Sequence, residues 1–226
     1  MTPDAWADTV VIAVAAISTF LFTEVVRRFA WRGGAVVRPD ERRVHLRPTP
    51  TLGGIAMFGG LLVALLVAWL NGRFSEVFAN PVQLLGIVGA AAVIHAVGVV
   101  DDFRQVSAPA KVAGITFGAS LLVIAGVSIV TFRVPRFGLF LLSDDLVPLV
   151  TVLWVLAIAN AINLIDGLDG LAAGIVAIAA GSFLVYSTVL REEGIIEASN
   201  PGPLVAMCAL GGCLGCLPHT VSPARI

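Results

Sequence analysis

The sequence predicts an all-α protein, a polytopic bundle of transmembrane helices. Hydrophobic residues make up 58% of the chain and charged residues only 13%, and the mean hydropathy is +0.97, which exceeds ordinary soluble usage. A helix needs about 20 mainly apolar residues to cross the hydrocarbon core of a bilayer. Seven runs meet this requirement, at about residues 8–29, 52–70, 82–100, 112–131, 146–163, 170–190 and 203–218.

The connections between these runs are short and contain no low-complexity linker. We therefore expect a single transmembrane domain over residues 1–226. The first run is too long for the apolar part of a signal peptide and lacks a basic segment before it, so it should remain as a helix. The net charge of −1 says little about partners, and no nucleic acid is expected.

The basic residues predict the orientation. Seven of the 14 lysines and arginines lie at the end of the first run or between it and the second run: Arg27, Arg28, Arg32, Arg38, Arg42, Arg43 and Arg47. Because Lys and Arg collect on the cytoplasmic side, we expect this loop in the cytoplasm and the N-terminus outside. Alternation of the helices then places the connections near 101–111 and 164–169 in the cytoplasm as well.

Four carboxylates share this predicted face: Asp101, Asp102, Asp166 and Asp169. The first three fall at helix C-termini, whose partial negative charge repels a carboxylate by roughly 0.3–1 kcal/mol. A cation would reverse that balance, and clustered oxygen ligands without His or Cys favour Mg²⁺ with a phosphate substrate. The alternative is that these are solvated acids of interfacial loops. Asp144 and Asp145 form an equally close pair on the other side, with no predicted role.

The segment NAINLIDGLDG spaces Asn160, Asn163, Asp166 and Asp169 three residues apart. Such steps drift about 60° each around an α-helix, so the four side chains share a site only if the helix tightens or breaks. The interleaved glycines permit a break and a close approach of a ligand to the backbone. The segment therefore predicts a site for a polar substrate head, or else a glycine-rich hinge between two spans.

The loop RRVHLRPTPTLGG leads directly into the second apolar run. Its arginines and threonines, with the free N–H groups at the start of the helix, predict a phosphate or diphosphate site. The candidate residues are Arg42, Arg43, Arg47, Thr49, Thr51, Gly53 and Gly54. The alternative is a basic loop bound to anionic lipid head groups.

Three motifs in this order, PDERRVHLRPTPTLGG, GVVDDFRQVSAPAK and NAINLIDGLDGLAAG, resemble the polyprenyl-phosphate N-acetylhexosamine-1-phosphate transferases, from about residue 36 onward. The resemblance implies a bacterial plasma-membrane bundle of ten or eleven spans, of which about seven lie here. It implies Mg²⁺-dependent transfer, with Mn²⁺ as an alternative ion, of a sugar 1-phosphate from a UDP-sugar to a polyprenyl phosphate. UMP is released, and the lipid product begins synthesis of a cell-wall polysaccharide, lipopolysaccharide, arabinogalactan or teichoic acid. The resemblance leaves open whether the protein forms a homodimer.

The resemblance also implies residue roles. The catalytic pair of the family corresponds to Asp101 and Asp102. The metal ligands correspond to the same two residues and Asp166. The substrate-binding positions are Arg47, Thr49, Thr51, Gly53, Gly54, Lys111, Asn160, Asn163 and Asp169. The family pattern has Gln four residues after the lysine, whereas this chain has Ile115. We expect direct attack by the lipid phosphate, with a covalent aspartyl intermediate as the alternative.

The HLRPTPTLGG motif is more similar to that of the N-acetylglucosamine-1-phosphate branch than to that of the muramoyl-pentapeptide branch. UDP-N-acetylglucosamine is therefore the expected donor. Family members continue beyond a segment like Pro223–Ile226 into a GDxGS motif with another metal-binding aspartate. We therefore expect the 226 residues to be an incomplete catalytic domain, inactive or impaired alone. The alternatives are the muramoyl-pentapeptide reaction, an ion transporter and a noncatalytic membrane protein.

Overall fold

The computed structural model describes residues 3–33, 36–37, 49–50, 52–104, 106–221 and 226. Helices make up nearly all of its regular structure, which confirms the all-α prediction. The helices are α1 (Pro3–Gly33), α2 (Gly53–Asn71), α3 (Ser75–Ala79), α4 (Val82–Arg104), α5 (Ala108–Ile124), α6 (Leu146–Ile165), α7 (Leu171–Glu192) and α8 (Gly202–Thr220). The described strands form two antiparallel pairs, β1 (Val36–Val37) with β2 (Thr49–Pro50) and β3 (Thr131–Val134) with β4 (Gly138–Leu141).

Six of the described helices are long and apolar enough to cross a membrane, namely α1, α2, α4, α6, α7 and α8. The chain is therefore that of a multi-pass membrane protein. The predicted boundaries are wrong for the fourth run, about 112–131, because α5 has 17 residues and ends at Ile124. Gly126 takes a left-handed conformation (φ +79°) that terminates the helix. The β-branched residues that follow are better suited to a strand.

The chain divides into two compact units. Unit 1 comprises Met1–Asn80 and Asn163–Ile226, and unit 2 comprises Pro81–Ile162. Unit 1 therefore contains α1, α2, α3, α7 and α8, while unit 2 contains α4, α5, the β3–β4 hairpin and most of α6. The last turn of α6 connects unit 2 to unit 1. Asp101 and Asp102 therefore belong to unit 2, whereas Asp166 and Asp169 belong to unit 1.

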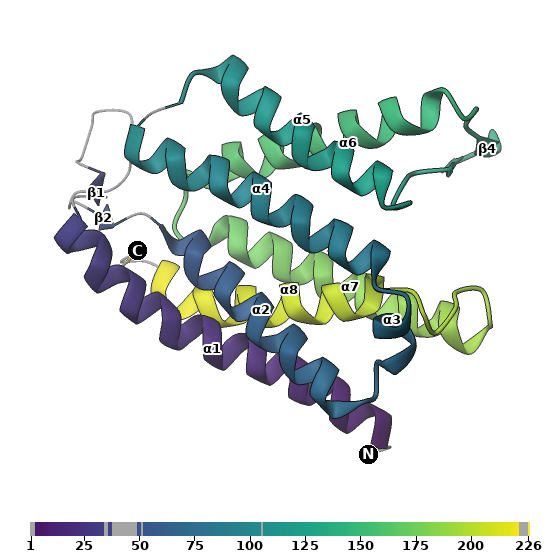
Figure 1. The fold of residues 1–226 in the computed structure, drawn as a ribbon, viewed down its shortest axis with the longest axis horizontal. Coiled ribbons are helices and arrows are strands. Elements are labelled where there is room, and N and C mark those ends of the chain that lie inside the picture. Colours follow the sequence, from purple (N-terminus) through teal and green to yellow (C-terminus); the bar gives the residue numbers. More distant parts are fainter. Residues whose placement is uncertain (1–2, 34–35, 38–48, 51, 105, 222–225) are drawn as a thin grey trace. The chain divides into compact units, whose positions relative to one another are not determined.

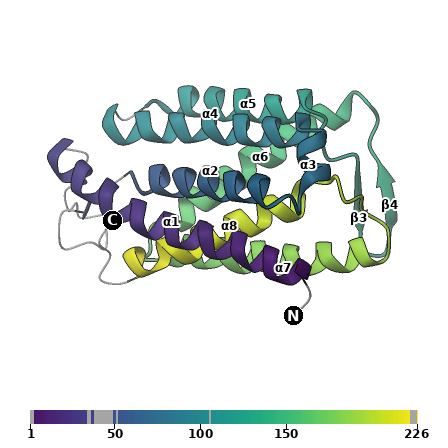
Figure 2. The same ribbon diagram turned by 60° about the horizontal axis from the view of Figure 1, so that its bottom comes forward.

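Unit 1 is built around α8, which packs against α1, α2 and α7. Figure 1 shows α1, α2 and α8 side by side, and Figure 2 shows the same grouping after rotation. Two glycines of α8 allow the closest approach, since a Cβ at Gly215 would overlap the backbone of Ala16 and one at Gly211 the carbonyl oxygen of Ile12. Small residues thus let these helices pack backbone to backbone, as is common within membranes.

Unit 2 is built on the antiparallel pair α4 and α5. A Cβ at Gly118 of α5 would lie 2.8 Å from the Ile94 side chain and 3.2 Å from the Ala90 carbonyl oxygen. The start of α6 is tied to the segment after α5, because the N–H of Ile129 donates to the Thr151 hydroxyl at 3.0 Å. This pairing of helices places the end of α4 beside the start of α5.

Candidate active site

Asp101 lies in the last turn of α4 and is held by the segment that follows it. Its Oδ1 accepts a hydrogen bond from the N–H of Val106 at 2.9 Å, and its Oδ2 lies 2.6 Å from Nζ of Lys111. Lys111 is in the first turn of α5, just after the N-cap residue Ser107. The short connection folds α5 back along α4, and it brings together two residues that the sequence had placed at the site.

The pair Asp101 and Asp102 lies at the C-terminal end of α4, the end predicted from the sequence. This end of a helix carries partial negative charge, to which the two carboxylates add. Lys111 and Arg104, which is also in the last turn, supply positive charge there. The Asp101 side chain is 25% exposed, whereas Asp102 is exposed to solvent. Asp102 is thus the more accessible of the two.

The Asp101–Lys111 ion pair is expected to stabilise unit 2 modestly. Both side chains are partly exposed, so solvent screening should limit their coupling energy to about 0.2–1 kcal/mol. A double-mutant cycle of Asp101→Asn and Lys111→Met, measured by denaturant unfolding in detergent, gives this energy directly. A control cycle of Asp101→Asn with Arg133→Met should be additive. Additivity in both cycles would show that the ion pair contributes no stability.

The segment NAINLIDGLDG breaks between two helices, which confirms the predicted departure from helical geometry. The helix α6 ends at Ile165 and α7 begins at Leu171, so Asn160 and Asn163 are helical while the two aspartates lie in the turn. The side-chain amide of Asn160 donates to the carbonyl oxygen of Leu156 at 3.0 Å. Asn160 is exposed, and its amide oxygen takes no part in that bond.

Asp166 differs from Asp101 in its surroundings. Its carboxyl reaches the surface, yet the protein around it removes enough water to raise its pKa. Within the described part of the chain it has no hydrogen-bond or ion-pair partner. Asp169 is half-buried and lies just before the N-terminus of α7. A partly desolvated carboxylate of this kind favours a bound cation, which would offset the loss of water.

Gly170 fixes the shape of this turn. It precedes α7 as the N-cap residue with φ +71°, a conformation that favours glycine. A Cβ there would lie 3.2 Å from Cγ2 and 3.5 Å from Cα of Val221, which follows α8. The turn that carries Asp166 and Asp169 is therefore packed against the end of α8 within unit 1.

The predicted phosphate site lies only partly within the described residues. The helix α2 begins at Gly53, as expected, and the residue before it, Leu52, is buried with φ 78°. The N–H of Ile55 is bonded to the carbonyl oxygen of Leu52 at 3.0 Å. Thr49 is in β2 and pairs with Val37. Arg42, Arg43, Arg47 and Thr51 lie outside the described residues, so the phosphate site stays a prediction.

The predicted Mg²⁺ ligands draw on both units, with Asp101 and Asp102 in unit 2 and Asp166 in unit 1. Within each unit, the described His, Cys, Asp and Glu residues form no group of three that could hold a metal ion. The carboxylate oxygens of Asp166 suit a hard cation, because they have no hydrogen-bond or ion-pair partner among the described residues. Asp101 fits less well, since both of its oxygens are engaged by Val106 and Lys111.

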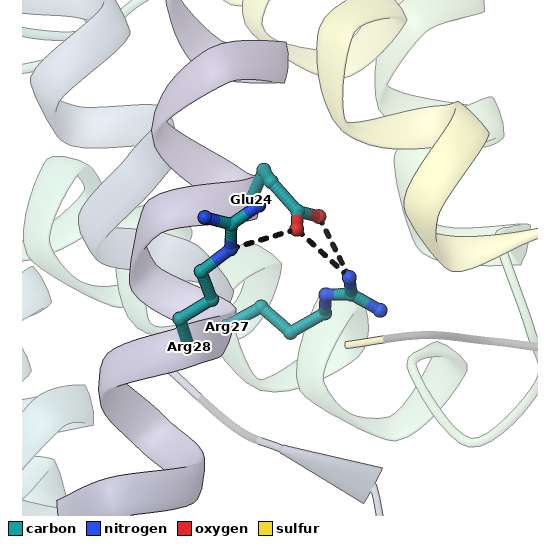
Figure 3. A network of polar contacts seen from close by, with 3 residues as sticks. All are labelled: Glu24, Arg27 and Arg28. Carbon is teal, nitrogen blue, oxygen red and sulfur yellow. Dashed lines mark hydrogen bonds and ion pairs between the residues drawn. The ribbon is translucent and has the colours of Figure 1, made fainter.

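Sequence reasoning missed a charge network near the end of α1 (Figure 3). Glu24 accepts hydrogen bonds from Nη2 of Arg27 at 2.9 Å and from Nε of Arg28 at 3.1 Å. Spacings of three and four residues on a helix bring such side chains together, so the pattern was visible in the sequence. Two of the seven arginines that predicted the orientation are therefore partly neutralised by a neighbouring carboxylate.

His219 of α8 was also left without a role. Its side chain is 4% exposed, and its ring packs on Phe20 of α1 with the centroids 4.6 Å apart. Neither ring nitrogen has a hydrogen-bond partner within the described residues. No sequence signal indicated this packing, because it depends on the close approach of α8 to α1.

Comparison with known proteins places these segments in a family. The sequence pattern of glycosyl transferase family 4 matches residues 84–226, a range that contains both carboxylate segments and Lys111. The decaprenyl-phosphate N-acetylglucosaminephosphotransferase of Mycolicibacterium smegmatis is 38% identical over 215 residues, which cover 94% of this chain and 53% of that protein.

Two other relatives show how far the similarity extends. The probable undecaprenyl-phosphate N-acetylglucosaminyl 1-phosphate transferase of Bacillus subtilis is 32% identical, over 96% of this chain and 56% of that protein. The phospho-N-acetylmuramoyl-pentapeptide-transferase of Corynebacterium aurimucosum is 32% identical, over 93% of this chain and 67% of that protein. The chain spans about half the length of the N-acetylglucosamine-phosphate relatives that it matches.

Proposed function

Because the chain belongs to glycosyl transferase family 4, we propose that it serves the transfer of N-acetylglucosamine 1-phosphate from UDP-N-acetylglucosamine to a polyprenyl phosphate. The observation that carries this proposal is the similarity to the mycobacterial decaprenyl-phosphate enzyme, which extends over 94% of the chain. That similarity includes the loop before α2, the end of α4 and the turn between α6 and α7.

In the proposed reaction, an oxygen of the lipid phosphate attacks the phosphorus that is attached to the sugar. A new P–O bond forms there, the bond between that phosphorus and UMP breaks, and the lipid carries a diphosphate sugar. The two phosphate-bearing substrates repel one another, so positive charge must hold them in reacting geometry. Lys111 and the N-terminus of α2 are the groups proposed to bind phosphate.

The carboxylates have separate proposed roles. Asp166 of unit 1 and Asp102 of unit 2 are the proposed Mg²⁺ ligands, and Asp101 would position Lys111 through the ion pair described above. Bound Mg²⁺ would supply the positive charge that offsets the developing charge on the phosphate oxygens. Asn160, Asn163 and Asp169 would bind the nucleotide sugar, for which amide and carboxylate side chains offer donors and acceptors. We place these segments on the cytoplasmic face.

A second candidate is the transfer of a phospho-N-acetylmuramoyl pentapeptide. The similarity to the Corynebacterium aurimucosum enzyme favours it, since that similarity covers almost the same part of this chain. The identity is lower than with the mycobacterial enzyme, and the HLRPTPTLGG loop resembles the N-acetylglucosamine branch. We therefore prefer the N-acetylglucosamine donor.

The test is release of UMP by the natural gene product that carries this sequence, purified and supplied with UDP-N-acetylglucosamine and decaprenyl phosphate. Release should require both the lipid phosphate and Mg²⁺, and a chelator should abolish it until Mg²⁺ is restored. UMP release without lipid, or release that a chelator leaves unchanged, would contradict the proposal. Cation flux across liposomes in place of turnover would indicate the transporter alternative.

A further inference from the structure

The β3–β4 hairpin of unit 2 exposes several large apolar side chains. Phe137 at the tip is 77% exposed, and Leu139 and Leu141 of β4 are 67% and 76% exposed. Phe132 and Phe140 face one another across the strands, with their rings 5.7 Å apart. A two-stranded hairpin with exposed apolar side chains is marginal in water by itself. Some other phase or surface must cover it.

The hairpin begins beside the first turns of α6. Thr151, whose hydroxyl binds the N–H of Ile129, lies five residues inside the start of this helix, or about 7.5 Å along its axis. The strand β3 begins two residues after Ile129, a distance of about 7 Å at most. The base of the hairpin is therefore close to the N-terminus of α6, a helix long and apolar enough to cross a membrane.

Hydrogen bonds also hold the end of β4 close to the start of α6. The N–H of Leu142 donates to the carbonyl oxygen of Val130 at 3.0 Å, and the N–H of Leu146 donates to that of Ser143 at 2.8 Å. The hairpin thus joins α6 through one short turn. Figure 1 shows it at the end of unit 2 where α6 begins, and Figure 2 shows both strands there as arrows.

The charges suit a lipid head-group layer. Arg133 lies opposite Leu139 in the strand register, and Arg136 lies in the tip with φ +74°, a conformation that few arginines adopt. Guanidinium groups bind phosphate through paired hydrogen bonds while their stems lie on apolar surface. Apolar side chains beside arginines, at the edge of a membrane span, are the composition of an interfacial segment.

We propose that the β3–β4 hairpin lies in the lipid–water interface and anchors this end of unit 2 to the bilayer. Four residues per strand make it about 14 Å long, whereas the head-group layer is roughly 5–8 Å thick on each side. An upright hairpin would carry its tip into water. A tilted hairpin keeps Phe137, Leu139 and Leu141 among the lipids, with Arg133 and Arg136 at the phosphates.

The test is spin-label accessibility in vesicles of phosphatidylcholine and phosphatidylglycerol. Nitroxides are attached in separate variants at Phe137→Cys and Leu139→Cys, and the unsubstituted protein, whose three cysteines are buried, gives the background. The control is Ala198→Cys, an exposed position in the loop between α7 and α8 that follows Glu197. At one or both hairpin positions, the ratio of oxygen to aqueous nickel accessibility should be several-fold higher than at Ala198.

Two results would overturn the proposal. Equal ratios at Phe137, Leu139 and Ala198 would place the hairpin in water. Dipolar broadening between labels of different molecules at high lipid dilution would show that a second copy of the chain covers the hairpin. Incorporation of one label per molecule, with the three buried native cysteines unreacted, shows in each variant that the fold is intact. The proposal does not depend on the proposed enzymatic activity, so each can fail alone.

Discussion

Replacement of Asp166 by asparagine is expected to reduce UMP release about 10- to 100-fold, the scale of effect seen when a metal site loses a supporting group. The substitution keeps the size of the side chain and removes its charge. The protein around Asp166 partly desolvates its carboxylate, which raises its pKa, and within the described residues no hydrogen-bond or ion-pair partner neutralises it. A neutral side chain here should therefore fold well and bind Mg²⁺ poorly.

The matched control is Asp144→Asn, which removes the same charge from the exposed pair Asp144 and Asp145 before α6. Its UMP release should equal that of the unsubstituted protein. Excess Mg²⁺ should restore part of the activity of Asp166→Asn, because weaker metal binding can be compensated by concentration. Equal activity of Asp166→Asn and Asp144→Asn would remove Asp166 from the proposed metal site.

Substitution of Gly215 by alanine is expected to destabilise unit 1 by about 1–3 kcal/mol, the usual cost of overpacking. The added methyl group would overlap the carbonyl oxygen of Ala16 and lie 2.9 Å from its carbonyl carbon. These are backbone atoms, which cannot rotate away, so α8 must move from α1. For a chain of this size the unfolding temperature should fall by about 2–12 °C.

The chain carries its own reporter for this change. Cys208, Cys213 and Cys216 are free and buried in α8, so they react with a fluorogenic maleimide only when the helix separates from its neighbours. The control is Gly174→Ala in α7, where an added Cβ meets nothing within 4 Å. Alanine should be neutral or stabilising there, by up to about 1 kcal/mol. A shift at Gly215 no larger than at Gly174 would contradict the packing argument.

The sequence predicted the six long helices α1, α2, α4, α6, α7 and α8 well, because each one is a long apolar run. The ends of α4 and α6 were predicted closely, since Asp101, Asp102 and Asp166 mark where the apolar residues stop. The turn at 166–170 was also foreseen from its glycines. Membrane helices carry this information locally, because the bilayer requires every backbone hydrogen bond to be made within the segment.

Other features depend on contacts that no local pattern contains. The segment 125–131, which leads from α5 into the hairpin, was predicted as the end of a span, because its residues are as apolar as those of a helix. The bond between Ile129 and Thr151 connects residues 22 positions apart. The Asp101–Lys111 ion pair required the fold of the connection between α4 and α5. The sequence identified both residues of that pair, but not that they bind one another.

The most direct test of the proposed function is mass spectrometry of the lipid product. The natural gene product that carries this sequence is supplied with Mg²⁺, decaprenyl phosphate and equal amounts of UDP-N-acetylglucosamine and UDP-N-acetylmuramoyl pentapeptide. The predicted result is decaprenyl diphosphate N-acetylglucosamine, formed in equal amount to UMP. A lipid-linked muramoyl pentapeptide, or no lipid-linked sugar at all, would contradict the proposal.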